Sequence, residues 1–151
     1  MDQNEARLVK SDKTPDMYIY GFNATDQERI KAATELAFNM ARKAHGALDM
    51  HGPDFELFRQ YFPGKSIEYV KWVLKNTMER RSKLTFKPLG QQREQAGAAA
   101  ATRKAEHEPI WLGALDKFES IDDLAATILH EMTHKQRTNI PHIFYCKCRN
   151  G

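Results

Sequence analysis

Hydrophobic residues recur every three to four positions in three long segments of the chain, a pattern typical of amphipathic helices. The first segment covers residues 25–45, opens with the capping-box sequence T-D-Q-E and stops before Gly46. The second follows Ser66 and the third follows Ser120, and serine is a favoured N-cap residue in both places. A shorter helix is predicted within residues 53–62. The chain is therefore expected to be rich in helix.

Short segments with aromatic and β-branched residues predict strands at residues 17–22, 84–87 and 110–112. The polar residues 1–16 are expected to form a loose arm, and residues 17–151 a single domain. Residues 90–108 are rich in glutamine, alanine and charged side chains, which predicts either a mobile loop or a hairpin over a cleft. The expected fold class is α+β, with a small mixed sheet next to the third helix.

The third helix carries His130-Glu131-Met132-Thr133-His134, an H-E-x-x-H motif. At about 100° per residue, both histidines point away from the apolar stripe of this helix, with the glutamate to one side. Two imidazoles one turn apart can bind one zinc ion, and the carboxylate beside the first can reach a water on that metal. The alternative interpretation is a solvated helix that displays two histidines by chance. The stripe consists of Leu124, Ala125, Ile128, Leu129 and Met132.

A catalytic zinc generally has three protein ligands and an open position for water, so the motif needs a third ligand. Positions 137 and 140 hold arginine and isoleucine, not the glycine and histidine of the metzincin continuation. No Asp or Glu occurs between Lys135 and Gly151, which excludes a glutamate ligand after the motif. His142 is therefore the preferred third ligand, in a three-imidazole set.

Alternatives stay open at the C-terminal end of the chain. His142 can also be a loop histidine that follows Pro141 and has no role at the metal. Cys146 and Cys148 are too close in sequence for an ordinary disulfide with each other. They can be free thiols, metal ligands or partners of a cysteine in another chain.

The residues around the motif resemble the active-site helix of the aspzincins, the deuterolysin and peptidyl-lysine metallopeptidase family. Residues 125–134 read A-A-T-I-L-H-E-M-T-H, and H-E-M-T-H or a near variant is common in that family. The family continues with G-T-x-D-x-x-Y-G, which residues 139–146 match in spacing and at the tyrosine. By this resemblance His142 takes the place of the family's aspartate ligand, and Tyr145 that of its transition-state tyrosine. The resemblance implies a zincin-like fold in which residues 110–112 form an edge strand along the substrate cleft.

These residues predict a zinc-dependent endopeptidase that acts on a protein or peptide substrate with one zinc ion, held by His130, His134 and His142. Glu131 would serve as general base, and Tyr145 would donate a hydrogen bond to the oxyanion. The resemblance to compact bacterial relatives implies a toxin or effector domain, for which a cognate inhibitor or immunity protein would be a partner. The alternative is a catalytically impaired zinc-binding domain for protein interaction, suggested by the histidine in place of the family's aspartate.

Charge and hydropathy limit the other partners. A net charge of +3, spread over residues of both signs, does not indicate nucleic acid or an anionic membrane. Nucleic-acid binding is a third hypothesis that only the basic pI favours, since the run Lys75, Arg80, Arg81 and Lys83 is interpreted as a solvated helix face. No apolar run approaches the ~20 residues of a membrane span, and the polar start is not a secretory signal. The chain as given is expected to be cytoplasmic, or exported without a cleavable signal.

Overall fold

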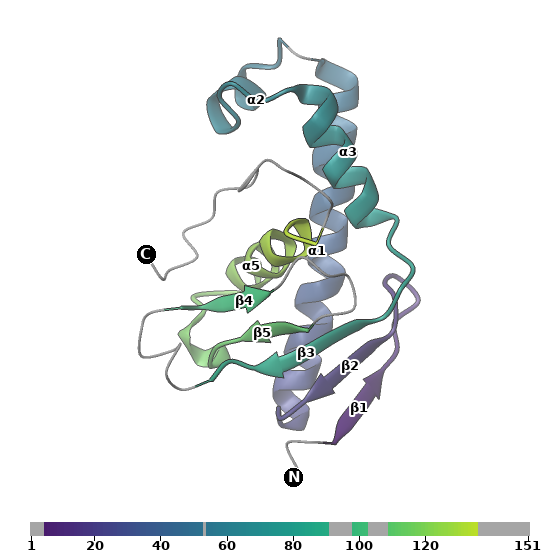
Figure 1. Cartoon of the computed structure of the whole chain (residues 1–151), viewed down its shortest axis with the longest axis vertical. Helices are drawn as coiled ribbons and strands as arrows, with labels where there is room; N and C mark the ends of the chain where they lie inside the picture. The colour runs from purple at the N-terminus through teal and green to yellow at the C-terminus, as the bar shows by residue number, and fades with distance from the viewer. Residues whose placement is uncertain (1–4, 53, 91–97, 103–108, 136–151) are drawn as a thin grey trace.

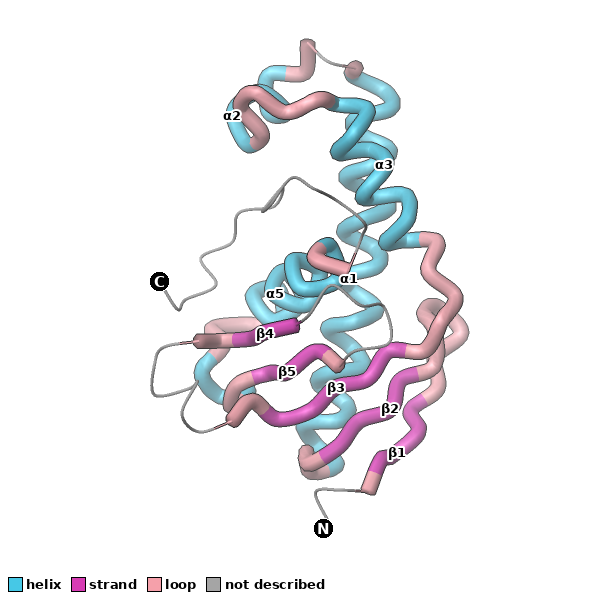
Figure 2. Tube along the Cα trace, in the orientation of Figure 1, coloured by secondary structure: helices cyan, strands magenta, loops and turns pink. Residues whose placement is uncertain are grey.

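The computed structural model describes residues 5–52, 54–90, 98–102 and 109–135, which form a mixed five-stranded sheet and a layer of helices (Figure 1). Figure 2 shows the strands side by side in one layer, with the longest helix crossing behind them. The predicted α+β class with a small mixed sheet is confirmed. The strands are β1 (Ala6–Val9), β2 (Met17–Tyr20), β3 (Leu84–Pro88), β4 (Ala100–Thr102) and β5 (Ile110–Leu112). The helices are α1 (Ala24–His51), α2 (Glu56–Tyr61), α3 (Ile67–Met78), the 3-10 helix η1 (Leu115–Lys117) and α5 (Ile121–Thr133).

The sheet has the strand order β1-β2-β3-β5-β4. The three inner strands run parallel to one another, and each edge strand pairs antiparallel to its neighbour. Along β2, β3 and β5 the residues alternate between buried and half-buried, the period of two expected where helices cover one face of a sheet. The covered face presents Met17, Ile19, Leu84, Phe86, Ile110 and Leu112 to the core.

Helix α1 connects the parts of the helical layer. It packs against both α3 and α5, and α5 in turn contacts β4 and β5 (Figure 1). Its fully buried positions include the small residues Ala33, Ala37 and Ala41, which allow neighbouring helices to approach closely. Helix α5 is thereby held between α1 and the β4 end of the sheet. None of the helices in the described part of the chain has the length and apolar character needed to cross a membrane.

The N-terminal residues differ from the sequence prediction. Residues 1–16 are predicted as a loose arm, but Ala6–Val9 forms strand β1 and pairs with Met17–Tyr20 of β2. The main-chain hydrogen bonds of this pairing satisfy backbone groups that water would otherwise have to satisfy. Four residues are too few to show a clear period in the sequence, so the strand gives no signal before the fold is known.

The strand at residues 110–112 also differs from its expected position. Residues 90–108 are predicted as a mobile loop or a hairpin over a cleft, and within this segment Ala100–Thr102 forms β4, which pairs antiparallel with β5 outside it. Strand β5 therefore lies between β3 and β4 and is not an edge strand. The edge on this side of the sheet is β4, and the expectation of an edge strand at residues 110–112 is wrong.

Candidate metal centre on helix α5

Helix α5 begins where the sequence predicts. The Ser120 Oγ accepts a hydrogen bond from the Asp123 backbone N–H at 3.1 Å, the geometry of an N-cap. Asp122 and Asp123 lie in the first turn, where the positive end of the helix dipole favours carboxylates. Just before the helix, the Arg29 guanidinium of α1 donates to the carbonyl oxygen of Leu115 at 3.1 Å. The start of α5 is thus held by its own cap and by a contact from α1 to η1.

Packing fixes the rotation of α5 about its axis. Leu124, Ala125, Ile128 and Met132 are all at most 1% exposed, as the predicted apolar stripe requires. Fully burying a Leu, Ile or Met side chain contributes roughly 1.5–3 kcal/mol each, so turning the helix away from this orientation would be strongly unfavourable. The direction in which the two histidines point therefore follows from the packing of the opposite stripe.

The histidines of the motif converge. His130 Nε2 and His134 Nε2 lie 3.1 Å apart, and the two rings meet edge to face at 88°, with their centroids 4.6 Å apart. Two imidazole nitrogens at 2.0–2.1 Å from one tetrahedral zinc are separated by about 3.3 Å. The observed separation is within a few tenths of an ångström of that value. The two side chains therefore fit the donor set of a single zinc ion.

A second chemical explanation of the same contact is a hydrogen bond between two neutral imidazoles, one of which carries its proton on Nε2. Both explanations require the two Nε2 atoms to face each other. They differ in the effect of removing one of the two rings, because only the loss of a metal ligand lowers zinc affinity.

The motif is more enclosed than the helical periodicity predicts. His130 and Glu131 are each 3% exposed, and His134 is half-buried. The Thr133 hydroxyl donates to the His130 carbonyl oxygen at 2.6 Å, which gives this buried polar group an acceptor. The predicted direction, away from the apolar stripe, does not lead to open solvent. A carboxylate and two imidazoles in such a setting interact more strongly than they would in water.

The structure places three of the five predicted site residues. His130 and Glu131 lie in the last turn of α5, and His134 is the C-cap residue that follows it. His142 and Tyr145, like Cys146 and Cys148, lie outside the described residues. Within the described ranges, no cluster of three or more His, Cys, Asp or Glu side chains could hold a metal ion. The third ligand and the catalytic tyrosine therefore stay predictions from the sequence.

Comparison of the chain with known protein families, curated proteins and solved structures finds no match. The interpretation of the site depends on the geometry of α5 and on the chemistry of its side chains.

Proposed function

We propose that this protein is a zinc-dependent endopeptidase of the zincin type, related in its site to the aspzincins. The observation that carries the proposal is the 3.1 Å approach of His130 Nε2 to His134 Nε2 on one helical turn. Glu131 follows His130 directly in the chain and is as deeply buried. His142 is proposed as the third ligand of the ion, because it is the only imidazole after the motif and matches the family's aspartate ligand in spacing.

Zinc bound by these three imidazoles would lower the pKa of a coordinated water towards ~7 and polarise the scissile carbonyl. Glu131 would accept the proton of the attacking water and deliver it to the leaving amine. Tyr145, three residues after His142, would donate a hydrogen bond to the oxyanion that develops on the substrate. Every group that the chemistry needs is thus supplied by two short segments, residues 130–134 and 142–145.

The enclosed position of the general base supports this proposal. Glu131 is 3% exposed, so bulk water does not compete for its carboxylate. Its place on the same packed helix fixes the position of its backbone relative to His130 and His134. Positioning of this kind is a large part of general-base catalysis, because the proton acceptor has to be within hydrogen-bond reach of the attacking water.

The alternative function is a zinc-binding domain for protein interaction that has lost its activity. One specific observation favours it: His142 stands where the aspzincins have an aspartate. A zinc site with a neutral imidazole has a net charge one unit more positive than the same site with a carboxylate, which changes the electrostatics of the site. The two functions differ in turnover by the zinc-loaded protein.

The substrate class and setting are also part of the proposal. An endopeptidase of this type would act on a protein or peptide, and the resemblance to compact bacterial members of the family suggests a toxin or effector domain. A cognate inhibitor or immunity protein would then be a natural partner. The net charge of +3 does not by itself favour nucleic acid.

The proposal is tested by hydrolysis of denatured casein with the protein supplied with one equivalent of zinc. We expect hydrolysis that stops when a chelator removes the metal and returns when zinc is added back, because the metal activates the water. Protein that binds zinc tightly and leaves casein intact would favour the interaction domain. Protein that neither binds zinc nor cleaves casein would reject both functions.

The third ligand is tested by three substitutions outside the helix. We expect His142→Ala to lower zinc affinity sharply, whereas Cys146→Ser and Cys148→Ser leave it unchanged, because a three-imidazole site does not use the thiols. Zinc affinity is measured by competition with a chelating dye. Loss of the metal in a cysteine variant, together with its retention in His142→Ala, would assign the ligand to sulfur.

A further inference from the structure

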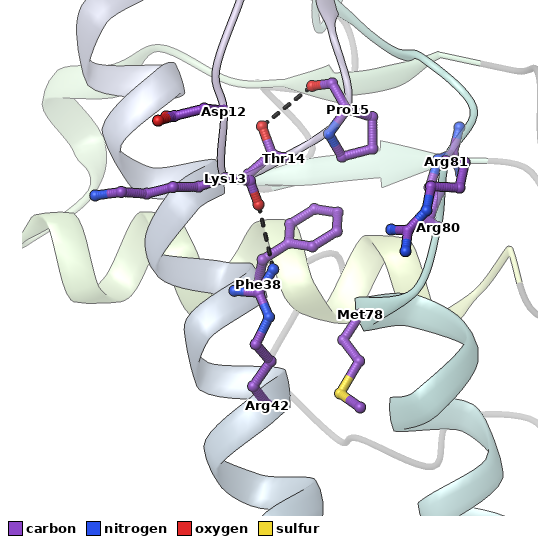
Figure 3. A pocket seen from close by; sticks show the side chains of 9 residues that line it. All are labelled: Asp12, Lys13, Thr14, Pro15, Phe38, Arg42, Met78, Arg80 and Arg81. Atoms are coloured by element: carbon purple, nitrogen blue, oxygen red, sulfur yellow. Dashed lines mark hydrogen bonds between the residues drawn. The ribbon is translucent and has the colours of Figure 1, made fainter.

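A pocket of about 250 Å³ lies apart from the motif, between the loop that joins β1 to β2, helix α1 and the segment that ends α3 (Figure 3). None of its lining residues belongs to α5. Its charged side chains are four cations, Lys13, Arg42, Arg80 and Arg81, and a single carboxylate, Asp12. These cations come from three separate parts of the sequence, residues 13, 42 and 80–81, so only the fold brings the three parts together.

The two central guanidinium groups are held in place by the chain. The Arg42 Nη2 donates to the carbonyl oxygen of Lys13 at 3.2 Å, and the guanidinium carbon lies 6.0 Å from the centroid of the Phe38 ring. The Arg80 Nε and Nη2 donate to the carbonyl oxygens of Ser82 and Lys83 at 3.1 and 2.7 Å. Figure 3 shows both guanidinium groups directed towards the space beside the Phe38 ring. The cations are therefore partly pre-organised around one volume.

Arg80 corrects the sequence interpretation of its surroundings. The basic run that includes it is interpreted from sequence as a solvated helix face, but Arg80 is only 8% exposed and lies after the end of α3. Its hydrogen bonds to two backbone carbonyl oxygens compensate for part of the burial of its charge. The Arg80 side chain is therefore part of the wall of the pocket and not of a solvated helix face.

Three cations of the pocket, Lys13, Arg42 and Arg81, are not paired with a carboxylate in the described part of the chain. In the described part of the chain the salt bridges are Arg29–Asp26 and Lys71–Asp49, and neither involves Lys13, Arg42 or Arg81. Arg42 donates one hydrogen bond to a described residue, so most of its five N–H groups are available to a ligand. Like charges gathered in a concave site raise the local concentration of anions.

We propose that this pocket binds a small molecule that carries a phosphoryl group. The planar fork of an arginine matches two phosphoryl oxygens, and two arginines that face one volume can share such a group. The Phe38 ring, Met78 and Pro15 form an apolar part of the lining, against which a non-ionic portion of the ligand would pack. The volume is below the roughly 300–1,000 Å³ of pockets for drug-sized ligands, which favours a small ligand over a polymer.

The phosphoryl group could come from free phosphate or from a phosphomonoester, and calorimetric titration distinguishes the two sources. The full chain is titrated with inorganic phosphate and with a nucleoside monophosphate, each at constant ionic strength set with sodium chloride. We expect saturable binding of at least one probe. Tighter binding of the monophosphate identifies a phosphomonoester, and equal affinity identifies phosphate alone as the recognised group.

The variants Arg42→Gln and Arg81→Gln remove exposed cations from the pocket, and both are expected to fold as the wild type does. Each should weaken binding by ~10-fold or more, as the loss of a charge-assisted contact implies. Lys43→Gln is the matched control, because it removes one charge from the next position of α1 and does not line the pocket. It should change the affinity by less than about 2-fold, the effect of a distant and screened charge.

The absence of saturable binding for both probes would overturn the proposal. Equal weakening by Lys43→Gln and Arg42→Gln would also overturn it, because the effect would then be one of general charge. Binding of a single-stranded oligonucleotide alone, with a steep dependence on salt, would assign the cations to a nucleic-acid surface instead.

Discussion

Glu131→Gln is expected to lower kcat/KM for casein hydrolysis by roughly 10²–10⁴-fold, the usual contribution of a general base. The amide keeps the shape of the carboxylate, which matters because the side chain is 3% exposed and tightly surrounded. It cannot accept the proton of the attacking water. Zinc content and melting temperature should therefore stay close to those of the wild type while turnover is lost. The measurement is the initial rate of hydrolysis by protein of known zinc content.

Glu119→Gln is the matched control for this experiment. It removes the same charge from an exposed residue just before α5, outside the motif. Its rate of hydrolysis should be close to that of the wild type. Equal rates for the wild type and Glu131→Gln would contradict the proposed base, and an equal fall in both variants would indicate a general effect of charge.

His134→Ala is expected to reduce zinc affinity by far more than the 10–100-fold typical of a lost second-shell partner, because one of three direct bonds to the metal disappears. His134 is half-buried at the end of α5, so its removal should leave the helix folded. His51→Ala, at the exposed end of α1, is the control and should bind zinc as the wild type does. Wild-type zinc affinity in His134→Ala would show that the contact with His130 is only a hydrogen bond between the rings.

The helix starts were the part of the fold that the sequence predicted best. The sequence predicts both Ser66 and Ser120 as N-cap residues, and each accepts a hydrogen bond from the backbone N–H three residues later. The signal is local, because a cap needs only one side chain and the first turn. Helix α1 shows the limit of this reasoning, since its cap is Asn23, whose Oδ1 accepts from the Asp26 N–H at 2.8 Å, and not the predicted capping box.

The C-terminal end of α1 shows how packing overrides a local signal. The sequence predicts that this helix stops before Gly46, yet it continues to His51 and is capped by Gly52, whose φ of 73° suits glycine. A glycine inside a helix costs about 1 kcal/mol relative to alanine. Leu48 beyond it is 5% exposed, and burying a leucine contributes roughly 1.5–3 kcal/mol. The tertiary contact therefore outweighs the local penalty, and sequence periodicity alone does not reveal that contact.

The candidate metal site also has one part that the sequence predicts and one part that it does not. The spacing of His130 and His134 is a property of one helical turn, so the motif alone predicted that their rings would meet. The burial of Glu131 depends on what surrounds α5, which no local pattern records. The basic pocket is the extreme case, because Lys13, Arg42 and Arg80 come from three separate parts of the chain. Only the fold could place them around one volume.

The central claim is that His130 and His134 bind a zinc ion, and its most direct test is the zinc content and X-ray absorption spectrum of the wild-type protein after equilibration with zinc. We predict one zinc per chain, with three nitrogen ligands at about 2.0–2.1 Å and one further light-atom ligand. A chain that retains no zinc, or one that holds it through sulfur without imidazole, would contradict this account.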